Sequence, residues 1–139
     1  RKIISNIKQT LSIIKPDAVE RNLTKEIKSI FLKNNLIVKN SKKIHITKEE
    51  AAEFYKVHQS KPFYNDLCAY LSSGPIIVMI LEGDNAISMN RKVMGATDPK
   101  NAEENTIRKL YGISIDKNSV HGSDSLENAK KEIKFFFKS

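Results

Sequence analysis

The sequence is poor in the residues that stabilise small folds covalently or through metal ions. It contains one cysteine, Cys68, among 139 residues, so neither an intrachain disulfide nor a CxxC metal clip can form. No group of His, Cys, Asp and Glu has the spacing of metal ligands. These absences exclude disulfide scaffolds and zinc-binding modules, and the single cysteine favours the cytoplasm as the compartment.

Glycine is scarce as well, with five residues in the chain. Neither the P-loop pattern nor Gly-x-Gly-x-x-Gly occurs. Any phosphate that this chain binds must therefore be held by side chains rather than by a glycine-rich backbone loop.

Long hydrophobic runs are also missing. The longest, residues 76–81, is far shorter than the roughly 20 residues that a membrane-spanning helix needs. Residues 1–6 lack the apolar core and the small-residue cleavage site of a signal peptide. We therefore expect no membrane partner and a cytoplasmic location.

The composition that remains is that of a globular protein, with 40% hydrophobic and 29% charged residues. The length predicts one domain, residues 1–139, that is large enough to bury a core. The net charge of +8 indicates attraction to polyanions and fits nucleic acid and nucleotides equally well. The densest basic cluster, residues 39–43, has no aromatic residue to stack on bases, which favours a solvated basic face.

Hydrophobic periodicity predicts alternating strands and helices. Strands are expected at residues 11–14, at 36–38 continuing with a kink to 43–46, at 76–81, and in a short segment ending at His121. Helices are expected at residues 24–34, from the capping box at Thr47 to about His58, from Pro62 through Leu71, from a cap at Asp84 to Met94, and from residues 123–125 to Phe137. The two helices between residues 47 and 71 should form a hairpin, and residues 96–118 should form a long loop.

This order fits an α+β fold: a ferredoxin-like split βαβ, four-stranded antiparallel sheet with an added helical hairpin. Periodicity alone does not separate it from other α+β sandwiches.

The segment of residues 118–125 carries the clearest chemical signal. His121 ends a strand, Gly122 lets the backbone turn, and residues 123–125 open a helix whose N-terminus favours a nearby phosphate. Imidazole can be neutral and nucleophilic near pH 7, so a phosphate-handling histidine is one interpretation. The alternative is a turn histidine followed by helix-capping residues.

Residues 118–125 resemble the active-site signature of nucleoside diphosphate kinases, and matching segments extend from Gln9 to Lys138. The resemblance implies the ferredoxin-like fold. It also implies ping-pong transfer of the terminal phosphate from a nucleoside triphosphate, typically ATP, to a nucleoside diphosphate, through phospho-His121. By the same match, Ser123 and Glu132 position this histidine.

The other motifs match the nucleotide site of the family. Residues 12–17 resemble its strand-ending lysine motif, in which Lys15 contacts the phosphates and the sugar 3'-hydroxyl. Residues 54–55 and 58–64 resemble the segment that holds the base. The resemblance places Tyr55 near the transferred phosphate, Phe63 on the base and Leu67 in support of it.

Residues 90–99 resemble the stretch that binds the terminal phosphates. Arg91 and Thr97 match phosphate-contacting positions, and Arg108 adds a second arginine. Asn118 matches the position that reads the sugar hydroxyl, and Ile115 the position packing beside the base. Fixed positive charge of this kind is what phosphoryl transfer requires.

The resemblance further implies Mg2+ carried by the nucleotide phosphates, and a homo-oligomer built from a common dimer, with a hexamer favoured over a tetramer. Ile3, Ile4 and Ile7 have no obvious partner in the sequence. Residues 135–137 are all phenylalanine and cover more of the last helix than one core-facing stripe, so at least one should face another subunit or a neighbouring element.

The chain departs from the family pattern at Lys25 and Asn105, where many members have glycine, at Lys61, where they have arginine, and at residues 109–111.

Two other functions stay open. A basic ferredoxin-like module would bind single-stranded nucleic acid in a salt-sensitive way that survives loss of His121. The second open function is that of a catalytically silent assembly subunit. The full set of matched site residues argues against this function.

Overall fold

The computed structural model describes residues 7–56, 59–114 and 117–137. In this part of the chain four strands, β1 (Ile7–Ile14), β2 (Ile37–Ile44), β3 (Ile76–Asp84) and β4 (Val120–Gly122), form a sheet in the order β2-β3-β1-β4. Every neighbouring pair is antiparallel. The predicted ferredoxin-like, four-stranded antiparallel sheet is confirmed.

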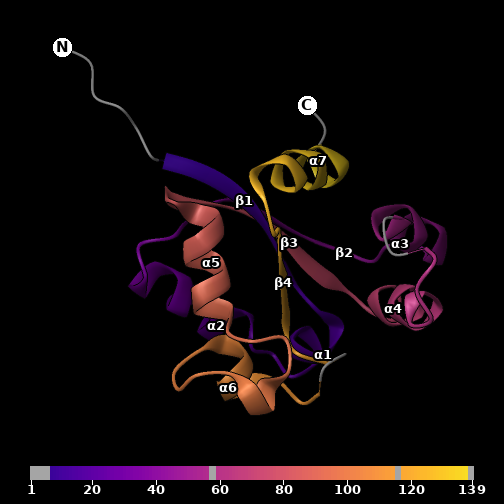
Figure 1. The fold of residues 1–139 in the computed structure, drawn as a ribbon, viewed down its shortest axis with the longest axis horizontal. Coiled ribbons are helices and arrows are strands. Elements are labelled where there is room, and N and C mark those ends of the chain that lie inside the picture. Colours follow the sequence, from indigo (N-terminus) through magenta and orange to yellow (C-terminus); the bar gives the residue numbers. More distant parts are fainter. Residues whose placement is uncertain (1–6, 57–58, 115–116, 138–139) are drawn as a thin grey trace.

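Seven helices and one 3-10 turn in the described residues surround this sheet. They are α1 (Pro16–Glu20), α2 (Thr24–Lys33), α3 (Lys48–Phe54), α4 (Tyr64–Leu71), α5 (Ala86–Met94), η2 (Pro99–Asn101), α6 (Ile107–Tyr111) and α7 (Leu126–Phe136). Helices α2 and α5 lie on one side of the sheet, and α3, α4 and α7 lie on the other (Figure 1). The sheet is therefore buried on both faces, which explains why residues 76–81 are apolar without alternation.

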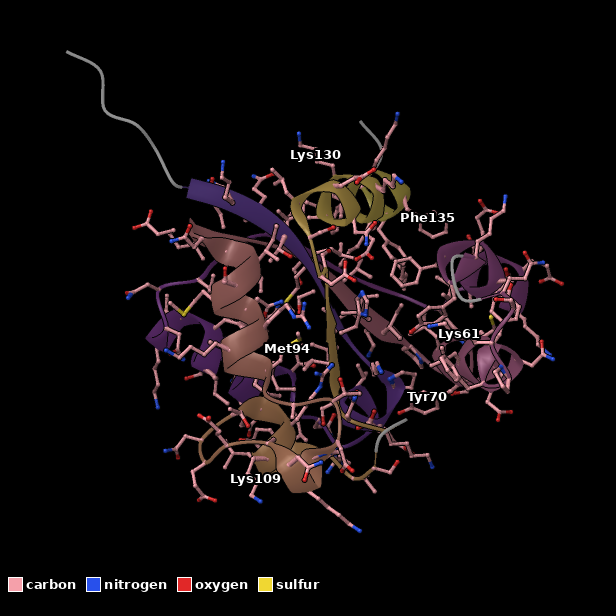
Figure 2. The ribbon with its side chains drawn as sticks, in the orientation of Figure 1. Lys61, Tyr70, Met94, Lys109, Lys130 and Phe135 are labelled. Atoms are coloured by element: carbon pink, nitrogen blue, oxygen red, sulfur yellow. The ribbon has the colours of Figure 1, made fainter. Side chains whose placement is uncertain are left out.

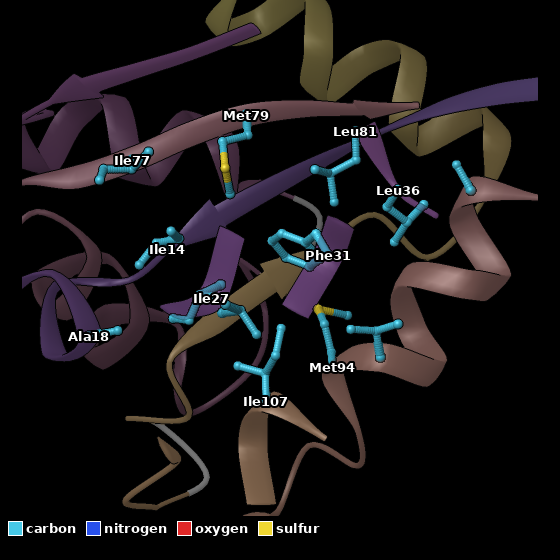
Figure 3. Packing of buried hydrophobic residues seen from close by; sticks show 13 residues of the cluster. Ile14, Ala18, Ile27, Phe31, Leu36, Ile77, Met79, Leu81, Met94 and Ile107 are labelled. Atoms are coloured by element: carbon cyan, nitrogen blue, oxygen red, sulfur yellow. The ribbon is translucent and has the colours of Figure 1, made fainter. Parts of the chain in front are cut away.

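Each strand divides its side chains between two cores. On β1, Leu11 and Ile13 point to the core beneath α3, α4 and α7, whereas Ile14 points to the other core. In that second core Phe31 of α2 is fully buried and packs with Ile27 and with residues of the sheet, α5 and α6 (Figure 3). Two filled cores hold the ends of β1 and β4 in fixed positions.

Several element boundaries were predicted correctly. The helix at 24–34 is α2, and Thr47 and Glu50 form the expected capping box, with Glu50 N donating to Thr47 Oγ1 at 3.0 Å. Gly95 closes α5 with φ 89°, as predicted. The kink expected in the second strand is a register shift between Val38 and Asn40 within one continuous β2. The hairpin of α3 and α4 is tied by Tyr64 Oη, which donates to Ala52 O at 3.0 Å.

Other boundaries were wrong. Pro62 lies in a turn and Phe63 is the N-cap, so α4 begins at Tyr64. Helix α3 ends at Phe54, well before the predicted end, and residues 57–58 lie outside the described residues. Asp84 is the last residue of β3, and Asn85, in the left-handed conformation, takes the N-cap position of α5.

The short elements were missed. Helix α1 follows Lys15 directly, because Pro16 suits a first helical position. Residues 96–118, predicted as a loop, contain η2 and α6, and the Thr106 side chain caps α6 by accepting from Lys109 N. Strands β1 and β3 are longer than predicted, and β4 extends one residue past His121 to Gly122. Helix α7 ends at Phe136.

The phenylalanines of α7 contact a neighbouring element of the same chain, which is one of the two predicted outcomes. Phe135 projects from α7 toward α3 (Figure 2), and the rings of Phe135 and Phe136 lie 5.8 and 5.2 Å from that of Phe54.

Ile3 and Ile4 lie outside the described residues. Within the described chain, no helix combines the length and the apolar character needed to span a membrane.

Candidate active site

His121 is held by a carboxylate from the last helix. It lies on β4, which pairs with β1 opposite Ile13. Its Nε2 lies 3.1 Å from Glu132 Oε1, and Ser123 Oγ donates to the same oxygen at 2.7 Å. The predicted grouping of these three side chains is present, and the carboxylate bound to the imidazole comes from the middle of α7 rather than from its N-terminus.

This hydrogen bond decides which ring nitrogen can act as a nucleophile. A carboxylate oxygen accepts hydrogen bonds, so the neutral imidazole donates its Nε2–H to Glu132. The lone pair is then on Nδ1. Because Ser123 is fully buried and binds the same oxygen, Glu132 cannot turn away without breaking both contacts.

Aromatic side chains of α3 and its C-cap border the histidine. The Phe54 ring lies 5.3 Å from the imidazole in an edge-on contact. Burial, and then the Glu132 carboxylate, raises the pKa of the Tyr55 phenol well above its usual range. Tyr55 therefore stays protonated at neutral pH and can donate a hydrogen bond.

Asn118 connects two predicted phosphate-binding residues. Lys15 Nζ donates to Asn118 Oδ1 at 3.0 Å, and Asn118 Nδ2 donates to Thr97 O at 3.0 Å. Lys15 and Asn118 are 6% and 1% exposed. A lysine this buried keeps one orientation, so its charge is aimed before any ligand arrives.

Arg108 is anchored by backbone carbonyls. Its Nη1 donates to Gly95 O at 3.0 Å and its Nη2 to Val120 O at 2.9 Å, while its buried Nε has no hydrogen-bond partner. Burial, and then the nearby Arg91, lowers the pKa of Arg108 to about 10. The guanidinium is therefore charged at neutral pH, and an anion bound beside it would stabilise this charge.

These residues border one cavity of about 460 Å³. Of the residues predicted from the sequence, those that line it are Lys15, Tyr55, Phe63, Leu67, Arg91, Thr97, Arg108, Asn118 and His121. Glu132 contacts the histidine and Ser123 contacts Glu132, and neither residue lines the cavity. Ile115 lies outside the described residues.

The two rings of the site differ in exposure. Phe63, at the start of α4, is 44% exposed, and Lys61 Nζ lies 5.8 Å from its ring centre. Tyr55 is 6% exposed. A partly exposed ring over a cavity can stack on a flat ligand, whereas a buried phenol is restricted to a polar contact within the cavity.

Three lining residues were not predicted. Met94 and Gly122 face each other, and a Cβ at Gly122 would collide with the Asn90 side chain, so β4 approaches α5 closely only because position 122 is glycine. Asp124 is the third, and a hydrogen bond from Asn128 lowers the pKa of its carboxyl. Its place within the His121 motif was the signal that could have found it.

Size alone would have selected another place. A cavity of about 700 Å³ beside α1 and α4, and a groove of about 670 Å³ between β2, α3 and α7, are both larger and contain none of the predicted site residues. The cavity beside His121 is smaller, but it combines three cationic side chains with a nucleophile. Chemistry rather than volume identifies the site.

The donor atoms fit a metal ion that is carried by a ligand. Among the described residues no group of three or more His, Cys, Asp and Glu is arranged to hold a metal ion. Among the described residues that line this cavity, Asp124 is the one carboxylate. A Mg2+ ion would need most of its oxygen ligands from elsewhere.

Comparison with known proteins gives a consistent result. The family model described as nucleoside diphosphate kinase matches residues 8–139. The chain is 56% identical over 131 residues to a nucleoside diphosphate kinase of Nitratiruptor sp., covering 94% of this chain and 96% of that protein. It is 58% identical over 130 residues to a nucleoside diphosphate kinase of Rhizorhabdus wittichii, covering 94% of this chain and 93% of that protein.

A solved structure gives the same result for the fold. The chain matches the crystal structure of the Aquifex aeolicus nucleoside diphosphate kinase with a TM-score of 0.94 and 39% identity, covering 96% of each chain. This agreement extends over the sheet and both helical layers. The comparisons do not favour a nucleic-acid-binding module.

Proposed function

The chain belongs to the nucleoside diphosphate kinase family, and from this premise we propose that His121 is the residue that carries the phosphate during its reaction. The chain transfers the terminal phosphate of a nucleoside triphosphate to a nucleoside diphosphate. Its ping-pong course means that donor and acceptor use the same site in turn.

The contact between His121 Nε2 and Glu132 Oε1 supports this proposal most directly. It leaves the lone pair on Nδ1, which attacks the terminal phosphorus of the donor while the bond to the leaving diphosphate oxygen breaks. Glu132 then stabilises the positive charge that phosphorylation creates on the ring. In the second half-reaction the acceptor diphosphate takes the phosphoryl group from Nδ1.

We propose that Lys15, Arg91 and Arg108 stabilise the transferring phosphoryl group, together with Thr97. Negative charge spreads over its oxygens in the transition state, and preorganised cations stabilise it without further rearrangement. Tyr55, as a protonated phenol, donates to the same group.

The other lining residues hold the nucleoside. The partly exposed Phe63 ring stacks on the base with support from Leu67 and Ile115, and stacking tolerates many bases. Asn118 binds the sugar hydroxyl, with Lys15 as its neighbour.

We propose Mg2+ bound to the nucleotide phosphates, since the described donors do not form a protein-held site. The ion supplies charge neutralisation on the phosphate oxygens. Asp124 would be the protein carboxylate facing it.

For the molecule as a whole we propose a single domain over residues 1–139, a cytoplasmic location and a homo-oligomer, a hexamer rather than a tetramer. The one sheet with helices packed on both faces supports the first of these.

The test is brief mixing with ATP labelled on its terminal phosphate, followed by intact-mass measurement under alkaline conditions, where phosphohistidine survives. One phosphoryl group per chain should appear, and it should be absent from His121→Ala, which still binds nucleotide. His45→Ala is the matched control, because His45 lies outside the cavity and contacts Ser72 O. Appreciable ping-pong turnover by His121→Ala would refute the assignment.

A further inference from the structure

The backbone just before the catalytic histidine has an unusual conformation. Ser119, between Asn118 and β4, has a φ of 79° and is fully buried. Val120 N donates to Asn118 O at 3.0 Å, so Ser119 is the centre of a γ-turn in the left-handed region, a rare and strained form for a residue with a side chain. Such strain persists only where the surroundings enforce it.

A polar network surrounds this turn, buried at Asp17 and Ser119 and partly exposed at Arg21 and Tyr70. The Asp17 side chain is 4% exposed, and its Oδ2 accepts from Arg21 Nη2 at 3.2 Å and from Ser119 Oγ at 3.4 Å. The Tyr70 hydroxyl donates to Asp17 Oδ1 and accepts from Asp17 N at 2.9 Å. Arg21 also donates to Tyr111 O at 2.6 Å. The network thus joins α1, α4, α6 and the turn at Ser119.

The turn is connected to the catalytic side chains by short links. Lys15 N donates to Ser119 O at 2.8 Å, and Lys15 Nζ donates to Asn118 Oδ1. His121 follows Ser119 by two residues. Neither Asp17, Arg21, Tyr70 nor Ser119 lines the cavity of the active site.

We infer that Asp17, Arg21, Tyr70 and Ser119 form a positioning network that keeps the backbone at Ser119 left-handed and thereby sets the places of Lys15, Asn118 and His121. This inference rests on the function proposed for His121. The four residues touch neither substrate nor reacting atoms, and they act through the turn. Tyr70 is suited to this task because burial and the Asp17 contact raise the pKa of its phenol, which keeps it a donor.

Glycine at position 119 provides the test, because it adopts positive φ without support from its surroundings. The rate of phosphohistidine formation is measured in single turnovers for Asp17→Asn, Ser119→Gly and the double variant, with the ADP dissociation constant measured separately. Asp17→Asn should slow phosphorylation roughly tenfold or more, with a smaller effect on ADP binding. In the Ser119→Gly background, Asp17→Asn should slow phosphorylation by roughly threefold or less, since the turn no longer needs the carboxylate.

A network that only ties α1 and α4 to the sheet would give a different result. Asp17→Asn would then slow the reaction by the same factor with serine or glycine at 119, and this additivity would overturn the inference. Ile27→Val is the control for general destabilisation, because it alters the core beneath α2 and should leave the rate unchanged.

Tyr70→Phe provides a second route if Asp17→Asn does not fold, since it removes the donor to Asp17 and keeps the ring. Its slower phosphorylation should also be relieved by Ser119→Gly, and an equal loss in both backgrounds would overturn the inference. Wild-type protein that forms no phosphohistidine would overturn both the proposed function and the network. Normal phosphorylation with additive variants would overturn the network alone.

Discussion

One carboxylate oxygen orients the chemistry at the scale of single residues. Glu132 Oε1 accepts from both His121 Nε2 and the buried Ser123 hydroxyl, and it belongs to the core-packed helix α7. The imidazole therefore has its tautomer and its rotation set by a rigid element rather than by a loop. A reacting group performs well only when its neighbours hold it in the productive orientation.

Glu132→Gln tests this arrangement. An amide oxygen still accepts from Nε2 but carries no charge to stabilise the phosphorylated ring, so we expect kcat to fall about 10- to 100-fold with a smaller change in nucleotide affinity. Glu127→Gln is the matched control on the same helix, since Glu127 is exposed and pairs only loosely with Lys131, at 3.6 Å. Equal kcat values for the two variants would contradict the proposed task of Glu132.

The buried Tyr55 and the half-buried Tyr70 give a prediction for alkaline pH. Burial raises the pKa of both Tyr55 and Tyr70, with Glu132 and Asp17 as the respective additional causes. Unfolded tyrosine ionises near pH 10, so above this pH the unfolded chain loses protons that the folded chain keeps. The free energy of unfolding should therefore fall as pH rises above about 10.

The ultraviolet absorbance of phenolate at about pH 11 is measured for the native and for the denatured protein, and the two values are compared. Of the four tyrosines in the chain, Tyr55 and Tyr70 should remain unionised in the native protein. Tyr70→Phe should remove one of these two and leave the other. Ionisation of all four while circular dichroism still reports a native fold would show the prediction to be wrong.

The junction of α5 with α6 matters most at the scale of elements. Gly95 ends α5 at φ 89°, and its carbonyl accepts from Arg108 of α6. A Cβ at Gly95 would lie 2.5 Å from Thr106 Oγ1 and 2.7 Å from Thr106 Cβ. The close approach of α6, and with it the place of Arg108, depends on this glycine.

Gly95→Ala should therefore lower the free energy of unfolding by about 2–4 kcal/mol, from the left-handed conformation and the overlap with Thr106. Gly74→Ala is the control, because its Cβ would meet Pro16 Cβ at an ordinary 3.6 Å and should change stability by less than about 1 kcal/mol. Urea unfolding measures both. Equal losses would mean that the space around Gly95 is not the cause.

At the scale of the whole molecule, several apolar side chains are left in contact with solvent. Leu32 on α2 and Ile37 on β2 are 68% and 55% exposed, and Ile113, just past α6, is 59% exposed. Strand β2 is also an edge of the sheet, with unpaired backbone groups along one side. In the proposed oligomer a neighbouring subunit would cover these side chains and shield the edge strand.

Light scattering coupled to gel filtration at micromolar protein measures the assembly. We expect a mass several times the 15.8 kDa of one chain, with six copies favoured over four. Ile37→Lys should shift the mass downward by placing a charge on the edge strand. A stable monomer of full activity would contradict the assembly and leave the proposal for His121 intact.

The sequence by itself determined the features whose cause is local. The apolar stripe of α2, the capping box at Thr47 and the end of α5 at Gly95 each depend on neighbours within one helical turn, and all three were predicted correctly. The resemblance to a known family, carried by motifs spread along the chain, named nine of the twelve residues that line the cavity.

Tertiary structure alone decided the rest. Helices α1 and α6 have five residues each, too few to be stable without packing, so no periodic pattern marks them. The network at Ser119 joins Asp17 to Tyr70 and to Ser119, 53 and 102 positions away. Contacts over such separations exist only after the sheet has brought β1 and β4 together, because sequence spacing carries information about neighbours along the chain and not about neighbours across it.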